Sequence, residues 1–238
     1  MPRLLILKTG DKLDALAGVP GDFEHWIAAG MGLAPGDWEA VAVHRGEPLP
    51  APAQVRAVAI TGSAAMVTDG SDWIEGSAAW LRQLVGDDVP VLGICFGHQL
   101  LAHALGGAVG NNPSGVEVGT VEVRHTAPVG DPLLGELPAL FPVQTSHRQV
   151  VMTLPPEARR LATTARDANH AFAVGRRVWG VQFHPEFDAH IARAYVQHSD
   201  AALRRQGDDP AQVVAHCSET PFGAEVLRRF AQLLPPLE

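Results

Sequence analysis

The sequence lacks any long apolar run. Its first hydrophobic stretch, Leu4–Leu7, is ended by Lys8, and later stretches are interrupted by charged residues, proline or glycine. A signal peptide needs an apolar region of about 7–15 residues, and a membrane-spanning helix needs about 20. We therefore expect a cytoplasmic protein with no membrane partner.

Cysteine is scarce, and basic residues are outnumbered. Only Cys95 and Cys217 occur in 238 residues, which excludes a disulfide framework, and we expect Cys217 to be a packing residue. Lys and Arg total 18 against 26 Asp and Glu, and no basic run could follow a phosphate backbone. The net charge of −8 therefore argues against a nucleic-acid partner.

Motifs for metal binding are also missing. The chain has 11 histidines, but neither His-Glu-x-x-His nor Cys-x-x-Cys occurs. His98 and His103 have the wrong spacing for two ligands on one helix. We therefore expect no metal and no other cofactor.

The first half of the sequence alternates between strand and helix patterns. Short apolar runs ended by turn residues indicate buried strands, and apolar residues at helical spacing indicate helices. The expected strands are 4–8, 38–43, 55–60 and 89–94, and the expected helices are 22–31, 72–85 and 96–105. This alternation predicts an α/β domain with a largely parallel sheet.

The second half has a different organisation. Strand patterns at 118–124, 150–154, 171–174 and 178–183 predict a strand-rich return sheet. From 188 to 234 the pattern is helical, with Pro210 and Pro221 at helix starts. No repeat or long linker divides the chain, so we expect a single domain over 1–238 with a helical tail over about 188–238.

The strongest candidate site surrounds Cys95. A buried strand runs into Gly93-Ile94-Cys95-Phe96-Gly97 and then into a helix. This arrangement is the thiol counterpart of the strained turn that exposes a hydrolase serine. The helix N-terminus favours a thiolate, and the N–H of Phe96 would point at a developing oxyanion. The alternative is a buried, unreactive cysteine.

A base and an orienting group stand at the end of another strand. In the segment 182–186, residues two apart share one face of the extended chain. Glu186 can therefore lie beside the ring of His184 and fix its tautomer, which completes a nucleophile–base–orienter set with Cys95. Taken alone, the segment could equally be a polar strand end.

Both segments resemble the signatures of class I glutamine amidotransferases, in the order found in that family. The two matching segments are Gly93-Ile94-Cys95-Phe96-Gly97-His98-Gln99-Leu100-Leu101 and Gly180-Val181-Gln182-Phe183-His184-Pro185-Glu186. They are most similar to GMP synthetase-type domains. The resemblance implies an α/β three-layer sandwich around a central, mostly parallel, flavodoxin-like sheet, with a C-terminal helical extension.

The resemblance also implies a reaction. The Cys95 thiolate would attack the γ-carboxamide of L-glutamine, and His184, oriented by Glu186, would protonate the leaving ammonia. Water would then hydrolyse the γ-glutamyl thioester.

Further residues of this sequence match positions that bind the oxyanion and the substrate in the family. They are Phe96, Gly62 and Ser63 for the oxyanion, and Gln99, Ser146 and His147 for the substrate. Two departures stand out. The turn after Gly62 holds less glycine than is usual, and Arg148 stands where GMP synthetase-type domains usually carry glycine.

Four functions remain open. The first is a glutaminase-type amidotransferase delivering ammonia to a synthetase in trans, because 238 residues leave no room for a synthetase domain. The second is a γ-glutamyl peptidase that acts on larger γ-glutamyl amides. The third is a catalytically silent regulatory or binding domain. The fourth is a protein of the stress-chaperone or deglycase type, in which histidine usually occupies the position of Phe96.

Overall fold

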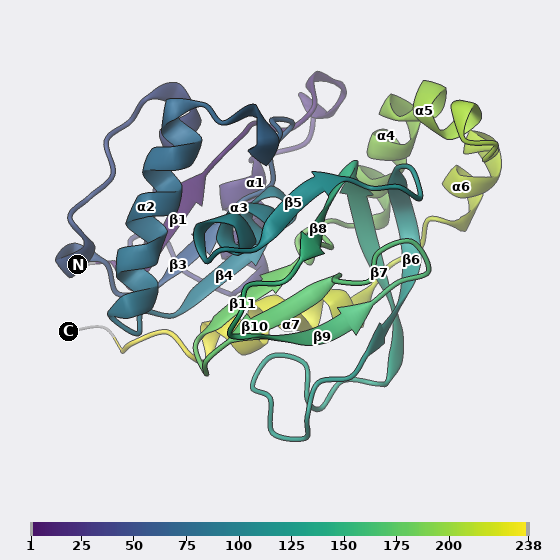
Figure 1. Ribbon diagram of the computed structural model, residues 1–238. Coiled ribbons are helices and arrows are strands. Elements are labelled where there is room, and N and C mark those ends of the chain that lie inside the picture. Colours follow the sequence, from purple (N-terminus) through teal and green to yellow (C-terminus); the bar gives the residue numbers. More distant parts are fainter. Residues whose placement is uncertain (1, 237–238) are drawn as a thin grey trace.

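A computed structural model describes residues 2–236, and a large mixed sheet runs through them (Figure 1). Its strand order is β2-β1-β3-β4-β11-β10-β9-β6-β7, and β5 pairs with β8 separately. The strands are β1 (Leu4–Lys8), β2 (Trp38–Ala42), β3 (Val58–Ile60), β4 (Val91–Ile94), β5 (Ala108–Asn111), β6 (Glu117–His125), β7 (Leu140–His147), β8 (Gln149–Thr153), β9 (Ala158–Thr163), β10 (Ala171–Val174) and β11 (Val178–Val181). The helices are α1 (Phe23–Gly30), α2 (Asp72–Gly86), α3 (Phe96–Ala104), α4 (Ala189–His198), α5 (Asp200–Arg205), α6 (Pro210–His216) and α7 (Pro221–Ala231).

The half of the sheet from β2 to β11 is parallel, and the half from β11 to β7 is antiparallel. The predicted α/β fold with a largely parallel first half is therefore confirmed. One strand lies elsewhere than its pattern suggested. The sequence grouped 178–183 with the return sheet, whereas β11 pairs in parallel with β4 at the centre of the sheet.

Helices cover both faces of the sheet and make three layers (Figure 1). In β1, alternate side chains enter different cores, because successive residues of a strand point to opposite faces. Leu4 and Ile6 pack in the cluster that includes residues of α1 and α7, and Leu5 and Leu7 pack in the cluster that includes α2 and α3. Each fully buried aliphatic side chain contributes roughly 1.5–3 kcal/mol.

The C-terminal helices divide into two groups. Helices α4 and α6 contact β6 at the antiparallel end, whereas α7 contacts β7 and α1. Val226, Leu227 and Phe230 are completely buried there, so α7 belongs to the main core. None of the helices in residues 2–236 is both long enough and apolar enough to cross a membrane. The single-domain organisation stays a prediction.

Candidate active site

Cys95 stands at the junction of β4 and α3. Its φ of 52° and ψ of −103° lie in a region that L-residues rarely adopt. The backbone N–H of Cys95 donates to the carbonyl of Val181 at 2.9 Å, which ties the turn to β11. Its thiol faces the carbonyl of Ser146 at 3.6 Å.

Two glycines make this turn sterically feasible. A Cβ on Gly97 would lie 2.6 Å from the carbonyl oxygen of Ile60, and one on Gly93 would collide with the carbonyl of Gly97. Backbone atoms therefore crowd the turn around Cys95. His98 lies on the other side of the turn, where its buried ring packs against Phe172 with a centroid distance of 4.9 Å.

His184 follows β11 and is brought to the same edge of the sheet as Cys95. Because β11 and β4 are parallel and Val181 pairs with Ile94, both chains leave the sheet at the same end. His184 Nδ1 lies 2.8 Å from Oε1 of Glu186, and the side chains of both residues are almost fully buried. Nδ1 therefore donates to the carboxylate, and Nε2 is left for the cavity.

The electrostatic surroundings favour a charged imidazole ring. Burial lowers the pKa of His184, but the carboxylate of Glu186 and the charge on the Cys95 sulfur outweigh it and raise the pKa to about 10. Phe187 stacks on the ring at a centroid distance of 4.0 Å and fixes its plane. These contacts hold the His184 ring in one orientation and favour its protonated form.

The segment after β3 lies against His184. A Cβ on Gly62 would be 2.8 Å from Cε1 of the His184 ring, so glycine is needed for this approach. The carbonyl of Gly62 accepts from the hydroxyl of Thr9 at 3.1 Å, which fixes the backbone. Ser63 and Phe96 both line the cavity that contains Cys95. The first turn of a helix leaves N–H groups without intrahelical acceptors, and Phe96 occupies that position in α3.

The three residues matched to substrate binding have different surroundings. Ser146 contributes its carbonyl beside the thiol. The side-chain amide of Gln99 donates to the carbonyl of Gln149 at 2.7 Å and to Oε1 of Gln182 at 3.0 Å, so it is committed to buried partners. All three residues border the cavity, but the side chain of His147 turns away toward Glu117.

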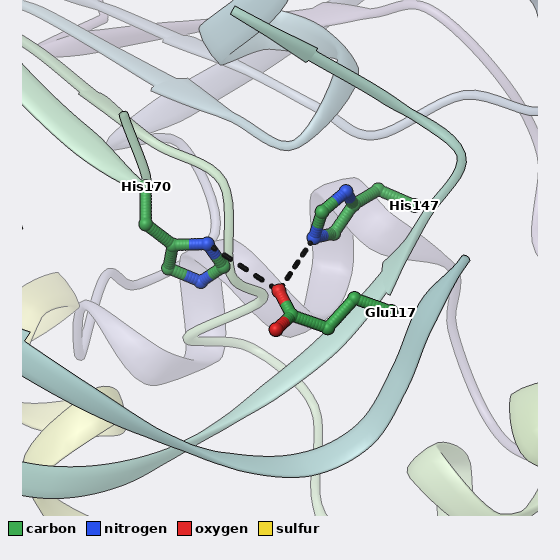
Figure 2. Close-up of side chains that lie close together, drawn as sticks. All are labelled: Glu117, His147 and His170. Carbon is green, nitrogen blue, oxygen red and sulfur yellow. Dashed lines mark hydrogen bonds and ion pairs between the residues drawn. The ribbon is translucent and has the colours of Figure 1, made fainter. Parts of the chain in front are cut away.

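That histidine belongs to a buried group that the sequence did not reveal. Donor atoms of Glu117, His147 and His170 lie within 4.8 Å of one another, close enough to hold a metal ion (Figure 2). Burial raises the pKa of Glu117, but the hydrogen bond from His147 and the charge of His170 bring it below its ordinary value. The three residues are far apart in the sequence and match no local metal motif.

The cavity itself measures about 220 Å³ and is bordered by Cys95, His184 and Arg148, among other residues. Sequence reasoning missed the aromatic wall beside it. Phe23 lines the cavity, and Tyr195 stacks on Phe187 with a centroid distance of 4.9 Å. Tyr195 lies in the tail that the sequence predicts to be helical, and only the folded chain brings it to the site.

Comparisons with known proteins show which family the chain resembles. The family model for the class-I glutamine amidotransferase matches residues 45–199. A GMP synthase (glutamine-hydrolyzing) of Aeropyrum pernix is 45% identical over 120 residues, which are 49% of this chain and 22% of that protein. Gamma-glutamyl peptidase 4 of Arabidopsis thaliana is 31% identical over 135 residues, covering 56% of this chain and 54% of the relative.

Solved structures share the fold at lower identity. A glutamine amidotransferase from Thermotoga maritima superposes with a TM-score of 0.75 at 20% identity, covering 98% of both chains. One from Methylobacillus flagellatus gives 0.76 at 23% identity, covering 100% of this chain and 96% of the other. The chain spans about a fifth of the GMP synthase and about half of the peptidase. Because the family model covers well over half of its residues, the chain belongs to the class-I glutamine amidotransferases, a family of cysteine-dependent amidohydrolases.

Proposed function

We propose that this chain hydrolyses the γ-carboxamide of L-glutamine, with Cys95 as nucleophile, His184 as proton carrier and Glu186 as the group that orients His184. One observation carries the proposal. His184 is buried between the Glu186 carboxylate, at 2.8 Å, and the Cys95 sulfur that raises its pKa. Such a pairing is the arrangement that activates a nucleophile and later delivers a proton.

The steps follow from this arrangement. The sulfur of Cys95 forms a bond to the carboxamide carbon, and the carbonyl oxygen becomes an oxyanion near the N–H groups of Phe96 and Ser63. The carbon–nitrogen bond breaks as His184 gives its proton to the leaving ammonia. Water then attacks the thioester while His184 takes a proton from it, and glutamate leaves as the thiolate is restored.

The fate of the ammonia is part of the proposal. The Aeropyrum relative is a glutamine-hydrolyzing GMP synthase, and the match covers only 22% of its length. By analogy, we propose that ammonia from this chain is used by a synthetase that docks in trans. The analogy indicates that the partner is a synthetase, but it identifies no particular ammonia acceptor.

A second candidate is hydrolysis of larger γ-glutamyl amides. A neighbouring cavity of about 450 Å³ shares Met66, Val116 and Arg148 with the cavity of Cys95. Arg148 and Arg205 border it, so their guanidinium groups could pair with the carboxylate of an amino-acid leaving group. This function accounts for the arginine that departs from the GMP synthetase-type pattern.

Glutamate release from L-glutamine and from γ-glutamyl dipeptides tests both candidates. Cys95→Ala should lower kcat by on the order of 10⁴-fold. Cys217→Ala is the matched control, because that cysteine is also buried but packs among the tail helices. Turnover of dipeptides alone would favour the second candidate. Unchanged turnover in Cys95→Ala would refute both. A folded chain with no turnover, and with Cys95 inert to a glutamine-like chloroketone, would favour a regulatory domain.

A further inference from the structure

Next to the cavity, β6, β7 and the segment before β10 bring a second group of titratable side chains together. Glu117 begins β6, His147 ends β7 and pairs with it across the sheet, and His170 directly precedes β10 (Figure 2). All three are at most 6% exposed. His147 Nε2 lies 3.0 Å from Glu117 Oε2, and His170 Nδ1 lies 3.7 Å from the same oxygen.

Both ring nitrogens of His147 face an oxygen atom. Nδ1 lies 3.2 Å from the carbonyl oxygen of Gln149, and Nε2 lies 3.0 Å from Oε2 of Glu117. A metal ion between Nε2 and Oε2 would bind both atoms, while Nδ1 donates to the Gln149 carbonyl.

The spacing of the donor atoms fits a metal ion. With metal–ligand bonds of about 2.0–2.2 Å, neighbouring ligand atoms of a tetrahedral zinc site are about 3.4 Å apart. The separations of 3.0 Å and 3.7 Å at Glu117 fall on either side of this value. Asp167 Oδ2 lies 3.1 Å from Nδ1 of His170 and adds a second carboxylate beside the three groups.

Two of the carboxylate oxygens around the proposed ion are held by other groups. Thr164 donates to Oε1 of Glu117 at 2.8 Å, and the N–H of Asn169 donates to Oδ1 of Asp167 at 2.8 Å. Together with the bond from His147 to the Gln149 carbonyl, these contacts orient Glu117, His147 and Asp167. Such outer contacts are the usual supports of metal ligands.

Charge also favours a divalent cation. The carboxylates of Glu117 and Asp167 are almost fully buried, and buried anions are costly unless cations balance them. One divalent ion balances both while the two rings stay neutral. A mixed set of imidazole and carboxylate ligands suits zinc and its neighbours better than calcium or magnesium.

We propose that Glu117, His147 and His170 bind one divalent transition-metal ion such as Zn²⁺. The ion ties the start of β6 to the end of β7 and to the segment before β10. Glu117 also borders a surface groove that contains Thr164, which gives the ion a route of entry. Because His147 follows Ser146, the link stabilises the strand end beside the thiol.

The test uses the full chain carrying Cys95→Ala, so that the thiol cannot bind zinc. After chelation and dialysis, zinc titration should give one equivalent per chain and raise Tm by about 5–10 °C at a hundredfold excess over Kd. X-ray absorption of the zinc form should show nitrogen and oxygen near 2.0–2.2 Å and no sulfur near 2.3 Å. Neither readout depends on amidase activity.

Ligand variants then locate the ion. Glu117→Gln and His147→Asn should each weaken zinc binding by at least about a hundredfold. Glu75→Gln and His103→Asn are matched controls, because these residues form an exposed pair of the same types at 2.9 Å and should leave the affinity unchanged. A chain that binds less than one equivalent at micromolar zinc with an unchanged Tm would overturn the proposal. The proposal would also be overturned if folded Glu117→Gln or His147→Asn bound zinc as tightly as the parent chain. X-ray absorption that showed sulfur at the metal would overturn it as well. Should the variants not fold, the absorption spectrum of the parent decides.

Discussion

Replacing Gly62 by alanine should disable the site with little change elsewhere. The φ of Gly62 lies outside the left-handed region, so alanine is compatible with the backbone. The obstacle is the new methyl group, which would lie 2.8 Å from Cε1 of His184. Ordinary carbon–carbon contacts are about 3.5–4.0 Å, so the ring or the turn must move by roughly 0.7 Å or more.

Neither side can move easily. His184 is clamped between the stacked ring of Phe187 and the carboxylate of Glu186. The Gly62 carbonyl is held by the hydroxyls of Thr9 and Thr61. Overpacking of this kind costs about 1–3 kcal/mol, which lowers Tm by roughly 2–12 °C for a chain of this size. A displacement approaching 1 Å at a catalytic group costs on the order of a hundredfold in rate.

Glutamate release and thermal unfolding should be measured together. Gly62→Ala is expected to lower kcat by about 10–100-fold. The matched control is Gly76→Ala in α2, where a methyl group would meet nothing within 4 Å. It should leave kcat unchanged and raise stability by about 0.5–1 kcal/mol. A Gly62→Ala chain with wild-type kcat and wild-type Tm would refute the claimed contact.

Three other substitutions test separate features. The pKa of His184 is raised from 6.5 to about 10, so the folded chain holds a proton that the unfolded chain has lost. Its contribution to stability is full below pH 6.5 and falls by up to about 1.4 kcal/mol per pH unit as pH rises toward 10. Glu186→Gln should therefore make Tm fall less steeply between pH 6.5 and 10 than it does in the parent chain. An identical pH profile of Tm would contradict the role of Glu186 in raising the pKa of His184. Phe187→Ala should cost about 3–5 kcal/mol in denaturant unfolding, because it opens a cavity against the His184 ring. A loss below about 1 kcal/mol would show that the stack is not packed as described. Gln99→Ala should cost about 1–3 kcal/mol by leaving Oε1 of the buried Gln182 side chain unpaired, and unchanged unfolding would instead favour a role in binding substrate.

Elements with a strong local signal were predictable from the sequence. The apolar run of β1 is confirmed, and the helix expected at 22–31 forms α1, which the side chain of Asp22 caps by accepting from the N–H of Phe23. The turn at Cys95 was also predictable, because a residue flanked by glycines between a strand and a helix is typical of a tight, crowded turn. In each case the neighbours in sequence are the neighbours in space.

Features set by distant pairing were not predictable. β7 carries Pro142 and the polar pair Gln144-Thr145, so its alternation is weak, yet β6 pairs with it along its whole length. The cluster around Glu117 depends on that register and on a loop residue, His170, that no local motif marks. The match of Gln99 to a substrate-binding position of the family likewise did not predict that its side-chain amide donates to two buried acceptors.

The position of β11 explains why the two halves of the site meet. β11 lies between β4 and β10, and its register is fixed on both sides. Gly180 makes this possible, because a Cβ there would lie 2.6 Å from the ring of His98 and 2.7 Å from that of Phe172. A slip of one residue would turn the side chains of β11 to the opposite face. His184 would then leave Cys95, so the tight packing at Gly180 also helps to set the distance between these two side chains.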